Sequence, residues 1–307
     1  MASSTETPPT SAVIGLGSMG WGAAISLLRA GLPTIGVDLR QDVLLRLQQA
    51  GGVAALTPSE AAQSADIVFV FVVNEAQTRQ VLFGERGAVD AARRGTVFVL
   101  CVTMPPSAAQ DIAHDLAERG MLVIDAPVSG GSLKAEAGDM TMMTSGSPEA
   151  FSKAEPAMAA ISGKVFRLGD APGIGSRVKM INQLLAGVHI AAAAEAMSLG
   201  ASIGVELDTL YKVIRESAGN SWMFENRGAH IVTGDYTPHS AVDIFVKDLG
   251  IVSNEAKGQA FPTPMTQAAL SLFEEASLAG MGAEDDAAVA KLLARKGKVT
   301  LPGMEDL

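Results

Sequence analysis

Short and almost entirely apolar segments recur through the first half of the sequence and alternate with helical patterns. "SAVIGLG", "PTIGVDLR", "DIVFVFVV", "TVFVLCV" and "MLVIDAPVSGG" are of this kind. Near-continuous β-branched and aromatic runs are typical of parallel strands that are buried on both faces. The alternation predicts a doubly wound α/β fold, a Rossmann-like parallel sheet with helices on both faces, over residues 11–172.

The pattern changes at "DAPGIGSR", after which strand signals nearly vanish. Long helical patterns follow, among them "VKMINQLLAGVHIAAAAEAMSLGASIG" and "PMTQAALSLFEEASLAG". Residues 173–307 are therefore expected to form an all-α domain that a long helix joins to the first. The polar start, residues 1–10, lacks the apolar core of a signal peptide and is expected to be a disordered leader.

The composition excludes several kinds of partner. A net charge of −10 argues against nucleic acid or an anionic membrane, because both require clustered Lys and Arg. No uninterrupted apolar run approaches ~18 residues, so no membrane span is expected. The single cysteine, Cys101, cannot form an internal disulfide and lies in an apolar run, which favours a buried thiol and a cytoplasmic protein. The sequence contains neither H-x-x-H nor C-x-x-C, and we expect no metal.

A glycine-rich turn follows the first predicted strand directly and precedes a helix. In "GLGSMG", Gly15, Gly17 and Gly20 have the G-x-G-x-x-G spacing, with Leu16, Ser18 and Met19 between them. The first glycine permits a tight turn, the second lets the backbone approach a pyrophosphate, and the third allows close helix–strand packing. An incidental glycine-rich turn is the alternative, but the position as the first βα turn favours a dinucleotide site.

The choice of dinucleotide depends on the end of the second predicted strand. Asp38 follows there in "GVDLR", where a carboxylate accepts hydrogen bonds from the adenosine ribose and repels a 2′-phosphate. This favours NAD over NADP. Arg40 complicates the preference, because it could pair with a 2′-phosphate, stack on the adenine or be a solvated loop charge.

A lysine and an amide lie three residues apart in "KMINQ". Lys179 and Asn182 would project from one helix face, either as ordinary surface groups or as a proton-transfer group and its neighbour. The four histidines are scattered and none belongs to a motif. A lysine titrates at about 10.4 in water, so it is a useful base near neutral pH only where its surroundings disfavour the ammonium form. Earlier in the chain, the "SGG" of residues 129–131 is either an anion-binding nest or a plain turn.

Four segments together resemble the β-hydroxyacid dehydrogenase (3-hydroxyisobutyrate dehydrogenase-like) family, in order and over residues from about 11 to 300. They are "GLGSMG", "DAPVSGGSLKAEAGDM", "GIGSRVKMINQ" and "FVKDLGIV". The resemblance implies an NAD-dependent oxidoreductase in which Lys179 is the general acid and base. It also implies a substrate site and a cofactor site. The implied substrate-binding residues are Ser129, Gly130, Gly131, Asn182 and Lys247. Beyond the glycine turn and Asp38, the implied cofactor-binding residues are Val73, Asn74, Thr103, Lys247 and Asp248.

Two segments depart from the family pattern. "VVNEAQ", residues 72–77, replaces a Leu-Pro-type sequence in a loop that meets the cofactor, and Gln183 stands where many relatives have a second asparagine. Phe245 and Trp222 could lie near the substrate or be core aromatics.

The stretch of residues 219–250 is most similar to the branch of the family that oxidises the sugar acid L-threonate at C2, which implies a role in carbohydrate-acid catabolism. The expected product is 2-dehydro-L-erythronate. Alternatives are the oxidation of 3-hydroxyisobutyrate and the reduction of tartronate semialdehyde or of succinic semialdehyde. A non-catalytic NAD-sensing or partner-binding regulator is the alternative outside enzymology. The alanine-rich residues 186–201 suit close helix packing, and a homodimer or homotetramer is expected.

Overall fold

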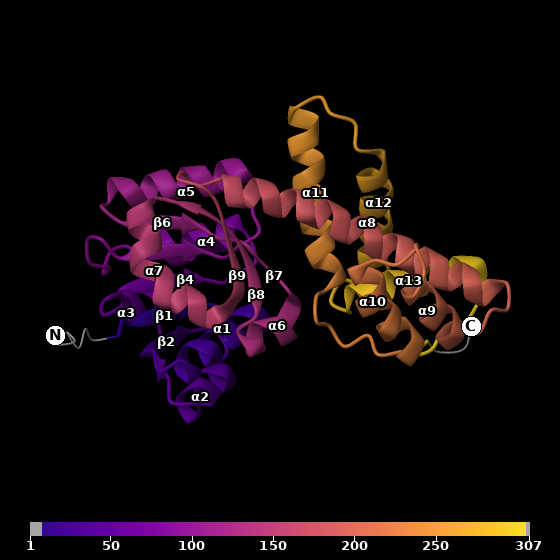
Figure 1. The fold of residues 1–307 in the computed structure, drawn as a ribbon, viewed down its shortest axis with the longest axis horizontal. Coiled ribbons are helices and arrows are strands. Elements are labelled where there is room, and N and C mark those ends of the chain that lie inside the picture. The colour runs from indigo at the N-terminus through magenta and orange to yellow at the C-terminus, as the bar shows by residue number, and fades with distance from the viewer. Residues whose placement is uncertain (1–7, 305–307) are drawn as a thin grey trace. The chain divides into compact units, whose positions relative to one another are not determined.

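The computed structural model describes residues 8–304 and divides the chain into two compact units, Met1–Lys179 and Met180–Leu307. The first unit is an α/β domain and the second is helical (Figure 1). Both fold classes were predicted from the pattern of apolar segments, and the similarity to known structures reported below confirms them.

The first unit contains a nine-stranded sheet (Figure 1). In sheet order its strands are β3 (Val53–Ala54), β2 (Thr34–Val37), β1 (Ser11–Ile14), β4 (Ile67–Val70), β5 (Val97–Leu100), β6 (Leu122–Asp125), β8 (Met140–Gly146) and β7 (Val128–Ser129), while β9 (Ser162–Gly169) pairs with β8. The first six of these are mutually parallel. β8 runs antiparallel to β6 and β7, and β9 is parallel to β8.

Helices cover both faces of this sheet. On one face lie α1 (Ser18–Arg29), α2 (Gln41–Gln49) and α7 (Pro148–Ile161), with α6 (Gly131–Ala137) packed against α1. On the other lie α3 (Pro58–Ala62), α4 (Glu75–Phe83) and α5 (Pro106–Glu118). Successive strand residues belong to opposite cores: Phe69 packs with the first set of helices, and Val68 and Val70 pack with the second. Burial on both faces explains why the strand sequences are continuously apolar.

The carboxyl ends of the central strands meet at one edge of the sheet. The register places Ile14 beside Val70, Val70 beside Leu100, and Leu100 beside Asp125. The segments that follow β1, β4, β5 and β6 therefore begin side by side. Ligands of open α/β sheets bind at this edge.

The second unit is built from helices around a single apolar core. α8 (Ile174–Ser202) begins in the first unit and continues into the second. It is followed by α9 (Leu207–Arg215), α10 (Trp222–Thr233), α11 (Val242–Gly258), α12 (Pro264–Ala276), a π-helical turn (Ser277–Met281), the short helix η2 (Asp286–Ala288) and α13 (Val289–Gly297). Phe245 and Phe273 stack at 5.2 Å between ring centroids in the core. Of the two aromatics with open alternatives, Phe245 packs in the core of this unit, and Trp222 is half-exposed.

Two sequence expectations concern the limits of these units. Residues 1–7 of the expected leader lie outside the described residues, whereas the Thr10 N–H donates to the Asp66 carboxylate at 2.9 Å, so the ordered chain begins before β1. The expected boundary at 172/173 compares with a division at 179/180, inside α8.

No membrane span was expected from the sequence. By length and composition alone α8 could cross a bilayer, a test that the core helix of a water-soluble protein also passes.

Candidate active site

The glycine turn connects β1 to α1 at the carboxyl edge of the sheet. Gly15 has a positive φ of 89°, and a Cβ there would lie 2.6 Å from the carbonyl oxygen of Phe71. A Cβ on Gly20 would lie 1.9 Å from the carbonyl oxygen of Gly15, so this turn closes on the helix more tightly than any side chain permits. Both glycines are required by the backbone itself.

Gly17 differs from these two glycines, because a Cβ built there meets nothing within 4 Å. It is the N-cap of α1, no side chain caps the helix, and its first turn has no acidic residue. The first N–H groups of α1 and its positive dipole end therefore adjoin open space, which suits the pyrophosphate of a dinucleotide. The geometry of the turn fits the cofactor that the sequence predicted.

Asp38, just beyond β2, is tied to this turn. Its Oδ2 accepts from the Leu16 N–H at 2.8 Å, and its Oδ1 accepts from Arg40 Nε at 3.0 Å. Arg40 Nη2 also donates to the Leu16 carbonyl at 3.0 Å. Burial raises the pKa of Asp38, but the hydrogen bonds and charge of Arg40 outweigh it, so the pKa lies below its ordinary value and the carboxylate is ionised at neutral pH. The structure shows Arg40 paired with Asp38, an arrangement that was not among the alternatives for this residue.

The loops after β4 and β5 reach the same edge. Asn74 caps α4, since its Oδ1 accepts from the Gln77 N–H at 2.9 Å, and the Val73 N–H donates to Gln77 Oε1 at 2.9 Å. The "VVNEAQ" departure from the family pattern is thus a capped helix start, with Val73 half-exposed. Thr103 follows β5 and is partly buried.

The "SGG" segment lies between β7 and α6. Gly130 and Gly131 have φ values of 135° and 74°, and no L side chain adopts the first comfortably. A Cβ on Gly131 meets nothing within 4 Å. The segment is therefore an obligatory glycine turn with open space at its second glycine, a geometry compatible with an anion nest.

Lys179 lies in the second turn of α8 and is 7% exposed. The start of this helix is attached to the end of β6, because Asp125 accepts hydrogen bonds from the N–H groups of Gly173 and Ser176. The helix start and Lys179 therefore belong to the same strand-end edge as the glycine turn. Nearby Cys101 is a buried thiol whose pKa is raised well above its ordinary value by burial and by the charge of Asp125, as expected for an inert cysteine.

In the second unit, the other predicted residues form one hydrogen-bonded chain. Asn182 Nδ2 donates to Gln183 Oε1 at 3.0 Å, and Gln183 Nε2 donates to Asp248 Oδ2 at 2.5 Å. Lys247 Nζ donates to the other oxygen of Asp248 at 2.5 Å. Gln183, which the sequence left as an uncertain substitution for asparagine, is the link between α8 and α11.

Sequence reasoning missed the polar groups that hold the predicted residues in place. Asp125, Ser145 and Ser176 are all buried, and they belong to segments whose apolar character or glycine content drew attention instead. An acidic residue at the end of an otherwise apolar strand was the available signal, because a buried carboxylate requires donors.

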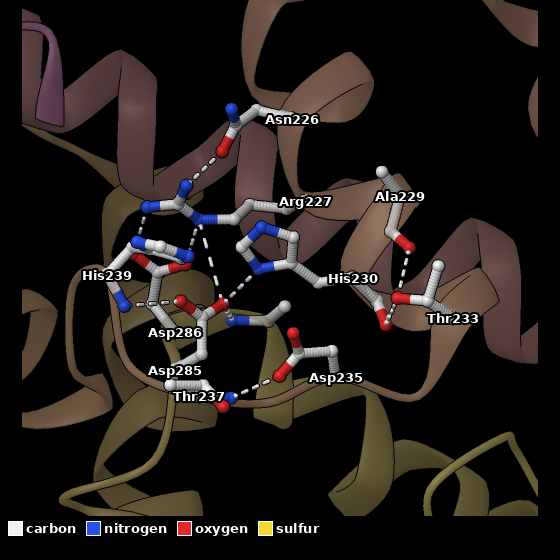
Figure 2. A network of polar contacts seen from close by, with 11 residues as sticks. Asn226, Arg227, Ala229, His230, Thr233, Asp235, Thr237, His239, Asp285 and Asp286 are labelled. Atoms are coloured by element: carbon white, nitrogen blue, oxygen red, sulfur yellow. Dashed lines mark hydrogen bonds and ion pairs between the residues drawn. The ribbon is translucent and has the colours of Figure 1, made fainter. Parts of the chain in front are cut away.

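A second buried polar cluster lies in the second unit, away from every predicted site residue in the sequence (Figure 2). Arg227 of α10 binds Asp286 through Nε and Nη2, the latter at 2.9 Å, and His230 Nδ1 lies 2.9 Å from Asp285 Oδ1. Asp285 also accepts from the His239 N–H at 3.1 Å. Burial raises the pKa of Asp286 to about 6, whereas the contacts of Asp285 with His230 and Arg227 outweigh burial and lower its pKa. The cluster joins α10, the loop before α11 and η2.

The structure also has a hollow of about 370 Å³ at the opposite edge of the sheet, near the starts of β4 and β5. Arg93 at its rim pairs with Asp66 at 2.8 Å, and Lys153 pairs with Glu149 at 3.1 Å. This edge is the one that open α/β sheets do not use for ligands. Among residues 8–304, no three His, Cys, Asp or Glu side chains are grouped so as to hold a metal ion.

Comparisons with known proteins agree with this geometry. Residues 10–169 match the family described as the NAD binding domain of 6-phosphogluconate dehydrogenase, and residues 173–293 match the NAD-binding family of NADP-dependent 3-hydroxyisobutyrate dehydrogenase. L-threonate dehydrogenase of Cupriavidus necator is 56% identical over 95% of this chain and 97% of its own length. That of Escherichia coli K12 is 52% identical over 95% of this chain and 96% of its own.

A solved structure is similar over nearly the same range. The crystal structure described as 3-hydroxyisobutyrate dehydrogenase from Salmonella typhimurium is 51% identical, with a TM-score of 0.89. The match covers 92% of this chain and 99% of that one.

Proposed function

Because the chain belongs to the 3-hydroxyisobutyrate dehydrogenase-like family of NAD-dependent oxidoreductases that act on CH–OH groups, we propose that it oxidises L-threonate at C2 to 2-dehydro-L-erythronate. The observation on which the substrate rests is the 56% identity, over nearly the whole length of both chains, to a protein named for that activity. Function follows the site rather than the fold. The residues at the strand-end edge therefore have to account for the chemistry.

NAD, when bound, supplies the hydride acceptor. The open N-terminus of α1 beside Gly17 is proposed to bind the pyrophosphate, and Asp38 the adenosine ribose, for which its ionised carboxylate is an acceptor. Val73, Asn74 and Thr103 are proposed to line the rest of the cofactor site in the first unit. Lys247 and Asp248, in the second unit, are also proposed as cofactor-binding residues. The support for the first three is that their loops end at the edge where the glycine turn lies.

Lys179 is proposed to hold the proton that leaves the substrate hydroxyl as C2 becomes a carbonyl. A general base must lie within hydrogen-bond reach of that hydroxyl and be neutral when the hydride departs. In the reverse direction its ammonium donates the proton and stabilises the developing alkoxide. The support is its position on the first turns of α8, which Asp125 attaches to the edge of the sheet.

The substrate carboxylate is proposed to bind at Ser129, Gly130 and Gly131, where the glycine turn leaves space above Gly131. Asn182 and Lys247, which belong to the second unit, are also proposed as substrate-binding residues. Their mutual hydrogen-bond chain through Gln183 and Asp248 fixes the two side chains before substrate arrives.

A panel of hydroxy acids tests the substrate assignment. The purified protein is assayed for NADH formation with L-threonate and 3-hydroxyisobutyrate, and for NADH consumption with tartronate semialdehyde and succinic semialdehyde. L-threonate is expected to give the highest kcat/KM. Rapid oxidation of 3-hydroxyisobutyrate without measurable oxidation of L-threonate would refute the assignment and favour the activity in the description of the Salmonella structure.

The protein is further proposed to act in the cytoplasm, in carbohydrate-acid catabolism, as a homodimer or homotetramer. The support for the compartment is its single buried cysteine, which suits a reducing environment. The support for assembly is the series of small residues on α8 together with its half-exposed Ile181 and Leu185. Light scattering coupled to size-exclusion chromatography measures the mass, and a monomer would refute assembly.

A further inference from the structure

The carboxylate of Asp125 is the most completely enclosed charge of the first unit outside the cofactor site. Asp125 is the last residue of β6 and is 0% exposed. Burial raises its pKa, and no Lys or Arg is among its hydrogen-bond partners described here. An ionised carboxylate can be buried only where donors replace the lost water, so its surroundings must be built for that purpose.

Four donors surround this carboxylate, and three of them come from the start of α8. Oδ2 accepts from the N–H groups of Gly173 at 2.9 Å and of Ser176 at 2.8 Å. Oδ1 accepts from the Ser176 hydroxyl at 2.7 Å, and the Ser145 hydroxyl of β8 lies 3.4 Å from Oδ2. Asp125 is therefore the N-terminal cap of α8, supplied by a neighbouring strand instead of by the helix itself.

The negative charge of Asp125 is favourable at the N-terminus of α8. α8 has no acidic residue in its first turn, although it is a helix of 29 residues with a positive dipole end. The carboxylate of Asp125 supplies the missing negative charge. Removing it would leave both the N–H groups and the dipole without a partner.

Close backbone contact fixes the same turn against the sheet. A Cβ on Gly175 would lie 2.4 Å from the carbonyl oxygen of Met143, and the Gly175 N–H donates to the Ser145 hydroxyl at 3.1 Å. Gly173 turns the chain into the helix with a φ of 103°. The first turn of α8 consequently has one position along β6 and β8 and one rotation about its own axis.

Lys179 follows Ser176 by three residues, which is slightly less than one helical turn of about 3.6 residues. Because both residues belong to the same hydrogen-bonded helix, a rotation or shift of the helix at Ser176 also rotates or shifts the side chain of Lys179. A displacement of about 1 Å at a reacting group costs on the order of 10²-fold in rate. We propose that Asp125 is a positioning residue for Lys179, holding the helix start in the one orientation in which the lysine reaches the substrate hydroxyl.

This inference rests on the proposed role of Lys179, and its test is chosen so that the two can fail separately. Asp125→Asn keeps the size of the side chain but replaces one carboxylate oxygen by an NH2 group. That group cannot accept hydrogen bonds from the N–H groups of Gly173 and Ser176. With the panel substrate that the wild-type protein oxidises fastest, we expect kcat to fall about 10²-fold. KM and the Kd for NADH should change less than about threefold. The number of NADH molecules bound per protein should stay at the wild-type value, because loss of folded protein would lower the apparent kcat and this stoichiometry together.

A second pair of variants covers the case in which Asp125→Asn does not fold. Ser176→Ala removes one donor and leaves the carboxylate, and kcat is expected to fall about fivefold. Ser176→Thr restores the hydroxyl and should restore most of the activity. In both Asp125→Asn and Ser176→Ala, amide hydrogen exchange should accelerate in residues 173–180 and stay unchanged in the later turns of α8.

Thr34→Val is the matched control. It deletes a buried hydroxyl hydrogen bond of 2.9 Å to the Leu32 carbonyl, at the opposite end of the sheet. It should lower the midpoint of thermal unfolding without lowering kcat. Wild-type kcat in Asp125→Asn or Ser176→Ala, while Lys179→Ala is inactive, would overturn the positioning role and leave the lysine assigned. Full activity in Lys179→Ala would instead overturn the proposed mechanism.

Discussion

Arg40 Nε lies 3.0 Å from the Asp38 carboxylate, so this cation near the adenosine end of the predicted cofactor site is already paired with a negative charge. The pairing relates cofactor choice to a single carboxylate. It also explains why an arginine two residues beyond that carboxylate does not by itself indicate NADP.

Asp38→Asn should shift the preference from NAD towards NADP. The ribose loses an ionised acceptor, so we expect the Kd for NADH to rise about tenfold. The guanidinium of Arg40 loses its ionised partner and can bind a 2′-phosphate, so we expect the Kd for NADPH to fall about tenfold. Fluorescence titration with each reduced cofactor measures both constants. The double variant with Arg40→Ala should lose the gain for NADPH, and unchanged NADPH affinity in Asp38→Asn would contradict this account.

Lys179→Ala should remove proton transfer and leave cofactor binding intact. General acid–base catalysis contributes typically 10²–10⁴-fold, so kcat is expected to fall by about that factor. Steady-state kinetics and NADH fluorescence separate the two effects. Lys164→Ala, at an exposed lysine of β9, is the control and should keep wild-type kcat.

Alanine substitutions at Gly17 and Gly20 should affect different properties, cofactor binding at Gly17 and stability at Gly20. At Gly20 the added Cβ meets the Gly15 carbonyl oxygen at 1.9 Å, so Gly20→Ala is expected to cost about 3 kcal/mol or more of stability. Gly17→Ala has space and should keep the wild-type unfolding midpoint, but its methyl group should occupy the place of the pyrophosphate and weaken NADH binding at least about tenfold. Circular dichroism and fluorescence titration give the two results. Wild-type NADH affinity in Gly17→Ala would show that the phosphates bind elsewhere.

Arg227→Met should destabilise the second unit strongly. It leaves Asp286 buried without its bidentate partner (Figure 2), and breaking a buried ion pair costs about 3–5 kcal/mol. Urea unfolding measures the change. Lys212→Met breaks the exposed pair with Asp208 on α9 and should leave the midpoint unchanged. Equal effects of the two variants would mean that the buried cluster contributes little.

Asp286 also gives a pH dependence whose sign can be stated. Its pKa is raised to about 6 in the folded protein, so between pH ~4 and ~6 the folded state keeps a proton that the unfolded state has lost. The stability of the wild-type protein relative to Asp286→Asn should therefore fall as the pH rises through this window, by at most about 3 kcal/mol. Urea titrations of both proteins at several pH values measure the difference, and a constant difference would contradict the raised pKa.

The fold was predictable because its main signals are local. Continuously apolar strands, glycines at fixed spacing and the change to long helices define both units, and the observed sheet follows them. The insertion of β8 between β6 and β7 was not predictable, because pairing between strands depends on packing over long sequence distances. Lys179 was found through its motif, whereas Asp125 was not. The role of Asp125 as a helix cap depends on N–H donors about fifty residues later in the chain, and no local sequence pattern shows that these donors lie close to it.

The capping of α8 by β6 has a consequence for dividing this protein into parts. A fragment ending at residue 172, where the motifs suggest a domain boundary, would lack Gly173 and Ser176 and so remove three of the four donors to Asp125. Of these four donors, Asp125 would keep only the Ser145 hydroxyl. A fragment of the nucleotide-binding half should therefore extend through the first turns of α8, and it would then include Lys179.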